Sequence, residues 1–454
     1  MNQKQIEQHV LQKVIPTPEQ KKKLYSITDD FIKKVKLELQ KRNTHVQVQL
    51  VGSVAKDTFL PDSLDIDVFL LFPVKTEKDV LAKEVQVLGT TLLTNTEQSY
   101  AEHPYIRGKY YDYEIELVPC YKITNPQQKH SAVDRTPFHT QYIKKHLSNE
   151  QKNEVRLFKQ FLKGIGCYGA EAQIEGFSGY LCELLILRYA TFHELIQQAS
   201  TWTQGTTLSL HKTTSPTFET PLVFIDPVDP ERNVASALSE EKFHLFIHAC
   251  KEYLKTPKYN FYFPHTRRPY SLKKIKEELQ DQQRIFIGIS LPKPSILDEN
   301  LYPQIRKALR SVKELCERYD FTIKNTYYYH DEVNKQIYLL LEPEVLTISS
   351  IRIHEGPPTD LTSHSTDFLN KWKNHPQLVE KPYRKENRWY VTLKREYTSI
   401  DHLLQEQISN VNLGKHFNEL VSNNISILNK QELIRPELTP LWTEILDPKD
   451  PWEV

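Results

Sequence analysis

The fold is decided by two neighbouring stretches, Leu50-Val51-Gly52-Ser53 and Asp65-Ile66-Asp67-Val68-Phe69-Leu70-Leu71-Phe72. The second stretch is apolar and partly β-branched or aromatic, which is typical of a buried strand. Side chains at positions i and i+2 of a strand point to the same face, so we expect Asp65 and Asp67 to lie side by side. Two carboxylates this close repel each other, and a bound metal ion is the usual way in which a protein neutralises them.

A third acidic strand extends this pattern. The stretch 111–118 alternates strictly, and Glu116 stands immediately before Leu117-Val118-Pro119-Cys120. Asp112 and Glu114 share its face, and we expect them to be solvated. Oxygen ligands favour Mg²⁺, and three carboxylates on neighbouring strands are typical of a two-metal site for phosphoryl or nucleotidyl transfer. Asp-x-Asp alone would instead favour an exposed acidic edge strand.

The Gly52-Ser53 turn offers a second chemical feature. Its backbone N–H groups and hydroxyl, at the start of a short helix, suit the oxygens of a triphosphate. Lys56 follows one turn later and adds a positive charge. We therefore predict a nucleotide triphosphate site beside the carboxylates.

The composition limits the class of protein. The 454 residues predict about three domains. Lys and Arg number 59 and Asp and Glu number 58, so a globally cationic nucleic-acid coat is excluded, whereas local basic patches stay open. No apolar stretch is long enough to span a membrane, and the first residues have no secretory signal pattern. Five widely spaced cysteines without a CxxC pair predict reduced thiols and a cytoplasmic protein.

Hydrophobic periodicity predicts the remaining elements. A helix should start at the capping box Thr17-Pro18-Glu19-Gln20 and run to about Leu39. A strand at 284–289, a helix at 302–319 and strands at 321–323 and 336–341 suggest a ferredoxin-like layer. We further expect a strand at 46–51, helices at 77–93 and from 149 onward, including 180–187, a loop at 201–221, a linker near 263–265 and helical structure at 400–430.

The chain resembles the archaeal (class I) CCA-adding enzymes, which are tRNA nucleotidyltransferases of the polymerase β-like superfamily. The resemblance extends over about residues 45–310, and the last 150 residues match only in general layout. It rests on SLDIDVFLLFP (63–73), YAEHPY (100–105), VPCY (118–121), SAVDRTPFH (131–139), NEVRL (153–157), YGAE (168–171), GFSGYLCE (176–183), DPVDPERNVA (226–235) and DENLYPQ (298–304).

The resemblance implies an α+β fold in three parts. Residues 1–148 would form a polymerase β-like nucleotidyltransferase head, and residues 149–265 a helical neck or central domain. Residues 266–454 would form an α+β body and tail with a ferredoxin-like layer. The body and tail would bind the acceptor stem and T arm of tRNA, and the family commonly forms homodimers.

The resemblance also implies a reaction and its residues. The enzyme would add C, C and A to the 3′ end of tRNA from CTP and ATP, without a nucleic-acid template. Two Mg²⁺ ions would be held by Asp65, Asp67 and Glu116. The nucleotide would be bound by Ser53 and Lys56 at the triphosphate, by His139, Lys159 and Tyr168 at the phosphates and sugar, and by Arg232 at the base.

Three residues depart from the family pattern. The family usually has Glu where this chain has Asp65, Asp where it has Glu116, and Arg where it has Lys56. One carboxylate is shortened and one lengthened, so we expect them to compensate with an altered preference between Mg²⁺ and Mn²⁺. Two alternatives stay open: a poly(A)-type nucleotidyltransferase, and an RNA-binding protein whose catalysis is impaired.

Overall fold

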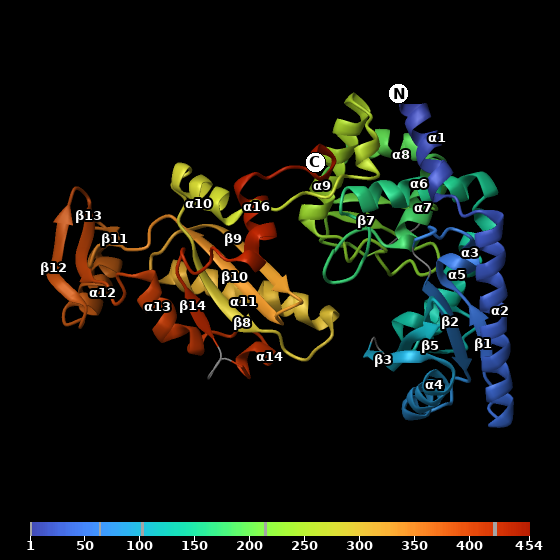
Figure 1. Ribbon diagram of the computed structural model, residues 1–454. Coiled ribbons are helices and arrows are strands. Elements are labelled where there is room, and N and C mark those ends of the chain that lie inside the picture. The colour runs from blue at the N-terminus through green and yellow to red at the C-terminus, as the bar shows by residue number, and fades with distance from the viewer. Residues whose placement is uncertain (1, 63–64, 101–103, 213–215, 421–424) are drawn as a thin grey trace. The chain divides into compact units, whose positions relative to one another are not determined.

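The computed structural model describes residues 2–62, 65–100, 104–212, 216–420 and 425–454 (Figure 1). The other positions include parts of the stretches 63–73 and 100–105, of the predicted loop 201–221 and of the predicted helical segment 400–430, which to that extent lie outside the described residues. The chain divides into two units, Met1–Thr266 with Lys449–Val454, and Arg267–Pro448. Both units mix helices and strands, so the predicted α+β class is confirmed.

The first part of the first unit carries the predicted strands. Its elements are α1 (Gln3–Val14), α2 (Pro18–Lys41), β1 (Gln47–Leu50), α3 (Gly52–Lys56), β2 (Asp65–Phe72), α4 (Lys78–Leu92), β3 (Thr94–Tyr100), β4 (Pro104–Tyr110), β5 (Tyr113–Tyr121), η2 (Ala132–Arg135) and α5 (Thr136–His146).

Five strands form one sheet in the order β1-β2-β5-β4-β3. β2 and β5 are parallel, and the other neighbouring pairs are antiparallel. The parallel register sets Asp65 opposite Glu114 and Asp67 opposite Glu116. The sheet therefore brings the three predicted metal ligands to two adjacent central strands.

The two faces of this sheet are covered differently. Ile66, Val68 and Ile115 face a core to which α2 and α4 contribute, and Figure 1 shows α2 alongside β1 and β2. Phe69 and Val118 belong to a smaller cluster on the other face. Because side chains alternate along a strand, Asp65 and Asp67 share the second face, away from α2.

The start of α2 follows its sequence signal. Thr17 caps the helix by accepting a hydrogen bond from the Gln20 backbone N–H, and the Gln20 side chain accepts one from the Thr17 N–H in return. Pro18 occupies the first helical turn. The predicted capping box is thus confirmed, and it fixes where the helix that covers the sheet begins.

One strand start was predicted too early. The alternation begins at Tyr111, but β5 begins at Tyr113. Tyr111 has φ +53°, a left-handed conformation that a side-chain-bearing residue rarely adopts. It lies in the tight turn between β4 and β5. The strand therefore begins after this turn, although the alternating pattern of the sequence already begins within it.

The rest of the first unit is mainly helical. Its elements are α6 (Asn149–Gly164), α7 (Gly179–Tyr189), α8 (Phe192–Ala199), β6 (Thr206–Leu208), β7 (Leu222–Phe224) and α9 (Glu240–Lys255). α1 packs on this helical core together with α6 to α9. Within the predicted loop 201–221, β6 pairs in parallel with β7, so the loop prediction was wrong there. The backbone pairing, which threonine-rich sequence does not reveal, makes this short strand.

The described residues of the second unit form two sheets. Its elements are α10 (Leu272–Asp281), β8 (Ile287–Pro292), α11 (Asp298–Arg318), β9 (Ile323–Asp331), β10 (Gln336–Pro343), β11 (Ile351–Pro358), α12 (Thr362–Trp372), β12 (Leu378–Lys385), β13 (Arg388–Lys394), α13 (Ile400–Gln407), α14 (Lys415–Asn418), β14 (Ser426–Leu428) and α16 (Thr439–Leu446).

The larger sheet has the strand order β14-β8-β10-β9, with each pair antiparallel. The predicted succession strand, helix, strand, strand is present as β8, α11, β9 and β10, so this order of elements is confirmed. The segment 400–430 is not helical throughout, because its end supplies the edge strand β14. β9 extends to Asp331, well beyond the predicted residues 321–323, because its polar residues lie on an edge of the sheet.

The smaller sheet has the order β11-β13-β12. Phe368 and Trp372 of α12 pack against Trp389 and Val391 of β13. All five cysteines are free and buried, as expected for reduced thiols. Within the described residues, no helix combines the length and apolar character needed to cross a bilayer.

Candidate active site

The carboxylates of β2 lie at a crowded acidic position. Burial and then the charge of Glu116 raise the pKa of Asp65. Burial and then the charges of Glu116 and Asp65 raise the pKa of Asp67 to about 7. A cation placed among these groups would favour their ionised forms, so their electrostatics suit a metal ion.

The backbone of Gly52 closes one side of this position. Gly52 has φ +69°, and a Cβ atom built there would lie 1.8 Å from Oδ2 of Asp67. The Val51 N–H donates to the Asp67 carbonyl oxygen at 3.0 Å. Only glycine fits both the left-handed backbone and this close approach. The Gly-Ser turn and α3 are therefore placed directly against the carboxylate of Asp67.

Glu116 is engaged by an arginine that the sequence analysis missed. Arg107 of β4 donates from Nε to Oε1 of Glu116 at 2.9 Å, and its Nη2 also donates to this oxygen. Among the described residues, no group of three or more His, Cys, Asp or Glu side chains is arranged closely enough to hold a metal ion. The donor chemistry of Asp65, Asp67 and Glu116 fits Mg²⁺. Arg107 would compete with the ion for Oε1 of Glu116.

Lys56 is paired with a residue from the helical part of the unit. Its Nζ lies 2.6 Å from Oε2 of Glu183 on α7, and the Thr58 hydroxyl donates to Oε1 of the same carboxylate at 2.5 Å. Both charged side chains are buried. The cation predicted at the triphosphate thus has a carboxylate counter-ion in this structure.

Lys159 and Tyr168 meet close to this pair. The buried ammonium of Lys159 donates to the Thr58 carbonyl oxygen at 3.0 Å, and burial lowers its pKa. A Cβ atom at Gly179 would lie 3.4 Å from the Tyr168 hydroxyl and 3.6 Å from the Lys159 ammonium. Two predicted nucleotide-binding side chains therefore converge at the start of α7.

His139 and Arg232 meet at one carboxylate. Asp226 lies 2.9 Å from Nε2 of His139 and accepts a hydrogen bond from Nη1 of Arg232 at 3.0 Å. The His139 ring also stacks on Tyr180, with 4.1 Å between ring centroids. The structure brings these two predicted residues together through a third that sequence reasoning had given no role.

Known proteins are similar to this chain along most of its length. Family models match residues 32–139 (nucleotidyltransferase domain), 153–263 (tRNA nucleotidyltransferase, second domain) and 282–430 (CCA-adding enzyme, C-terminal domain). The CCA-adding enzyme of Methanosarcina mazei is 33% identical over 434 residues, 94% of each chain. That of Thermoplasma volcanium is 38% identical over 424 residues, 93% of each chain. The chain belongs to the CCA-adding enzyme family.

Solved structures that resemble this member of the CCA-adding enzyme family include an enzyme of low sequence identity. A Cid1 poly(U) polymerase with Mg and 3′-dATP covers 57% of this chain and 96% of its own, at 13% identity and a TM-score of 0.45. At that TM-score the likeness supports no statement about this chain. The predicted division at residues 148 and 265 stays a prediction, as do the site residues.

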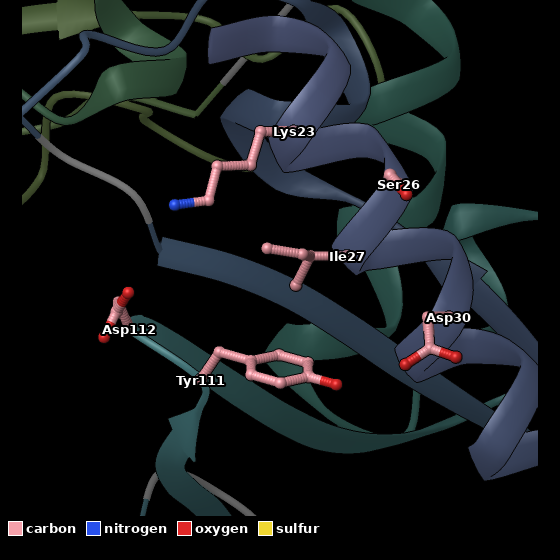
Figure 2. A pocket seen from close by; sticks show the side chains of 6 residues that line it. All are labelled: Lys23, Ser26, Ile27, Asp30, Tyr111 and Asp112. Atoms are coloured by element: carbon pink, nitrogen blue, oxygen red, sulfur yellow. The ribbon is translucent and has the colours of Figure 1, made fainter.

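A pocket in this CCA-adding enzyme family member lies apart from the predicted site. Figure 2 shows it between α2 and the turn that joins β4 to β5. It lies on the α2 side of the sheet, whereas the carboxylates are on the other face, and it contains none of the predicted site residues. Its lining consists of Lys23, Ser26, Ile27, Asp30, Tyr111 and Asp112.

The sequence analysis missed the partners of the predicted residues in this family member. Arg107, Glu183 and Asp226 each form an ion pair with one of them. Glu183 and Asp226 lie in stretches that carry the resemblance. That location was the signal in the sequence that pointed to them. The contact of Glu183 with Lys56 joins residues 127 positions apart, and that of Asp226 with His139 joins residues 87 positions apart, which no local pattern reveals.

Proposed function

We propose that this chain adds C, C and A to the 3′ end of tRNA, using CTP and ATP and no nucleic-acid template. The tRNA 3′-hydroxyl attacks the α-phosphate of the nucleotide, and pyrophosphate leaves. The observation that carries the proposal is the register of β2 and β5, which sets Asp67 opposite Glu116 beside the Gly-Ser turn. Membership of the CCA-adding enzyme family supports the choice of tRNA.

Asp65, Asp67 and Glu116 would hold the metal ions. Two Mg²⁺ ions, when bound, supply activation of the attacking hydroxyl and stabilisation of the leaving oxygen. In this structure, the Arg107 guanidinium is hydrogen-bonded to the Glu116 carboxylate. Arg107 thus neutralises an acidic group at the position where the metal would bind, and its own side chain is half exposed.

The cationic residues would hold the nucleotide. Ser53 and Lys56 lie on α3, which begins against the Asp67 carboxylate, and would contact the triphosphate. Lys159 and Tyr168 converge at the start of α7 and would contact phosphate and sugar. His139 would join them there, and Arg232 would read the incoming base. The tRNA acceptor stem and T arm, the homodimer and the cytoplasmic location stay predictions.

The altered carboxylates lead to a metal-preference proposal. Asp65 is one methylene shorter, and Glu116 one longer, than the family pattern. The first carboxylate therefore reaches less far from its strand and the second reaches farther. We expect the ratio of activity with Mn²⁺ to activity with Mg²⁺ to change when both are reverted together, as Asp65→Glu with Glu116→Asp. Equal ratios in the wild type and this double variant would contradict the proposal.

The test is nucleotide incorporation by the full chain. Labelled CTP or ATP is supplied with tRNA that ends at the discriminator base, and product lengths are resolved on a gel. Growth by three nucleotides that requires CTP and then ATP supports the proposal. Processive tailing with ATP alone would indicate a poly(A)-type enzyme. Binding of tRNA without pyrophosphate release, with either Mg²⁺ or Mn²⁺, would indicate an RNA-binding protein without catalysis.

A further inference from the structure

Asp226 is a buried residue just after β7, and its carboxylate has hydrogen-bond partners on several elements. Its carboxylate is fully buried. It accepts hydrogen bonds from the Tyr180 hydroxyl at 3.1 Å, the Val228 N–H at 2.9 Å and Arg232 Nη1 at 3.0 Å, and it lies 2.9 Å from His139 Nε2. One side chain therefore connects α5, α7 and the segment that carries Arg232.

We infer that Asp226 is a positioning residue for base selection, which holds Arg232 and His139 in the orientations that contact the incoming nucleotide. The inference rests on the proposed function, because it assigns the base-reading step to Arg232. Asp226 itself is buried and need not touch the nucleotide. It acts through the two side chains that it holds.

The hydrogen bond to Asp226 restricts the orientation of the Arg232 guanidinium. A guanidinium has five N–H donors in a fixed plane, and the Asp226 bond uses one on Nη1. The Arg232 side chain remains 29% exposed. Fixing one corner of the plane limits how the exposed N–H groups can turn toward a base. Discrimination between bases needs donors held in place, since a mobile cation would attract all nucleotides alike.

The charge of Asp226 determines which ring nitrogen of His139 donates a hydrogen bond. Burial alone would raise the pKa of Asp226, but the hydrogen bonds from His139 and Val228 and the charge of Arg232 lower it to about 2. An ionised Asp226 can only accept, so His139 donates from Nε2. Burial lowers the pKa of His139, which favours the neutral ring with an acceptor at Nδ1. Stacking on Tyr180 fixes the ring plane, so Asp226 and Tyr180 together hold the His139 ring in one orientation.

The test compares correct and incorrect nucleotides in the full-length Asp226→Asn variant. The specificity constant kcat/KM is measured for CTP and UTP on tRNA ending at the discriminator base, and for ATP and GTP on tRNA ending in CC. We expect both correct-to-incorrect ratios to fall roughly tenfold. Tyr180→Phe, which removes one hydrogen bond to Asp226, should lower the ratios in the same direction by less.

Asp229→Asn is the matched control. Asp229 is a buried carboxylate of the same loop, but its partners are Lys129 and Arg135. Its loss should slow all nucleotides equally and leave both ratios unchanged. Ratios within twofold of wild type in folded Asp226→Asn and Tyr180→Phe would overturn the inference. A wild type that extends no tRNA would instead refute the proposed function, so the two failures are distinguishable.

Discussion

The ammonium of Lys56 lies 2.6 Å from a carboxylate oxygen of Glu183, although 127 positions separate the two residues. The pair ties α3, which begins against the Asp67 carboxylate, to α7 in the helical part of the same unit. Both side chains are buried, and the Thr58 hydroxyl donates to the second oxygen of Glu183. The position of the predicted triphosphate cation thus depends on the packing of a distant helix.

Replacing Glu183 by Gln should destabilise the first unit. The substitution keeps the size of the side chain but leaves the Lys56 ammonium buried without its counter-ion. Breaking one partner of a buried pair costs about 3 kcal/mol of unfolding free energy. Urea denaturation measures this cost. The double variant Lys56→Gln, Glu183→Gln should recover about 1 kcal/mol or more, and an unchanged midpoint in Glu183→Gln would show that the pair contributes nothing.

Gly52→Ala should strongly reduce catalysis without unfolding the protein. The new Cβ atom would meet Oδ2 of Asp67 at 1.8 Å, so the carboxylate must move from its place. We expect a loss of roughly 100-fold in kcat. Gly166→Ala is the matched control, because Gly166 has φ +70° but open space around its Cβ position. That control should lose about 1 kcal/mol of stability and keep its activity. Equal activities of the two variants would disprove the steric argument.

Arg107→Gln should lower the Mg²⁺ concentration that gives half-maximal activity. The guanidinium and the metal compete for Glu116, and removing a partly exposed pair changes such an equilibrium roughly two- to fivefold. Lys109→Gln serves as control, because Lys109 lies on the same strand opposite Glu114. A Mg²⁺ titration in which Arg107→Gln needs more metal than wild type would contradict the competition.

The contribution of Asp229 to the free energy of unfolding should be lost at acidic pH. Burial alone would raise its pKa, but the hydrogen bonds and charges of Lys129 and Arg135 lower it below the usual 3.8. A folded-state pKa below the unfolded value contributes stability that is present above the unfolded pKa and lost as the pH falls toward the folded one. The stability difference between wild type and Asp229→Asn should therefore shrink as the pH drops below about 4.

Urea midpoints from about pH 6 to pH 3 measure this difference. Asp112→Asn, at an exposed position, should follow the wild-type profile. Parallel profiles for wild type and Asp229→Asn would contradict the assigned cause.

Local patterns in the sequence predicted the central part of the fold. An apolar, partly β-branched or aromatic run predicted β2 with its two carboxylates, and the capping box predicted the start of α2. Both signals are properties of a few adjacent residues. β6 and β14 were not predicted, because each is a three-residue strand that exists through pairing with a distant partner. The same limit hid the turn at Tyr111, where the alternating pattern continues through a left-handed residue.

The candidate site could also be predicted only in part from the sequence. The residues expected to touch metal and nucleotide were found by motif and by resemblance, because their types reflect the chemistry. Their partners Arg107, Glu183 and Asp226 were not found, because an arginine opposite a glutamate, or a carboxylate beneath a histidine, becomes visible only when strands and helices are packed. Sequence reasoning predicts the groups that would act, and the structure adds the partners of several of them.

The central claim is that the carboxylates of β2 and β5 carry nucleotidyl transfer to tRNA. The most direct measurement is growth of tRNA ending at the discriminator base, with CTP, ATP and Mg²⁺, for wild type, Asp67→Asn and Glu114→Gln. Glu114 is the matched control, since it lies on β5 two residues before Glu116 and is exposed. We predict three added nucleotides for wild type and Glu114→Gln, and a loss of at least about 100-fold for Asp67→Asn. Wild-type extension by Asp67→Asn would contradict the account.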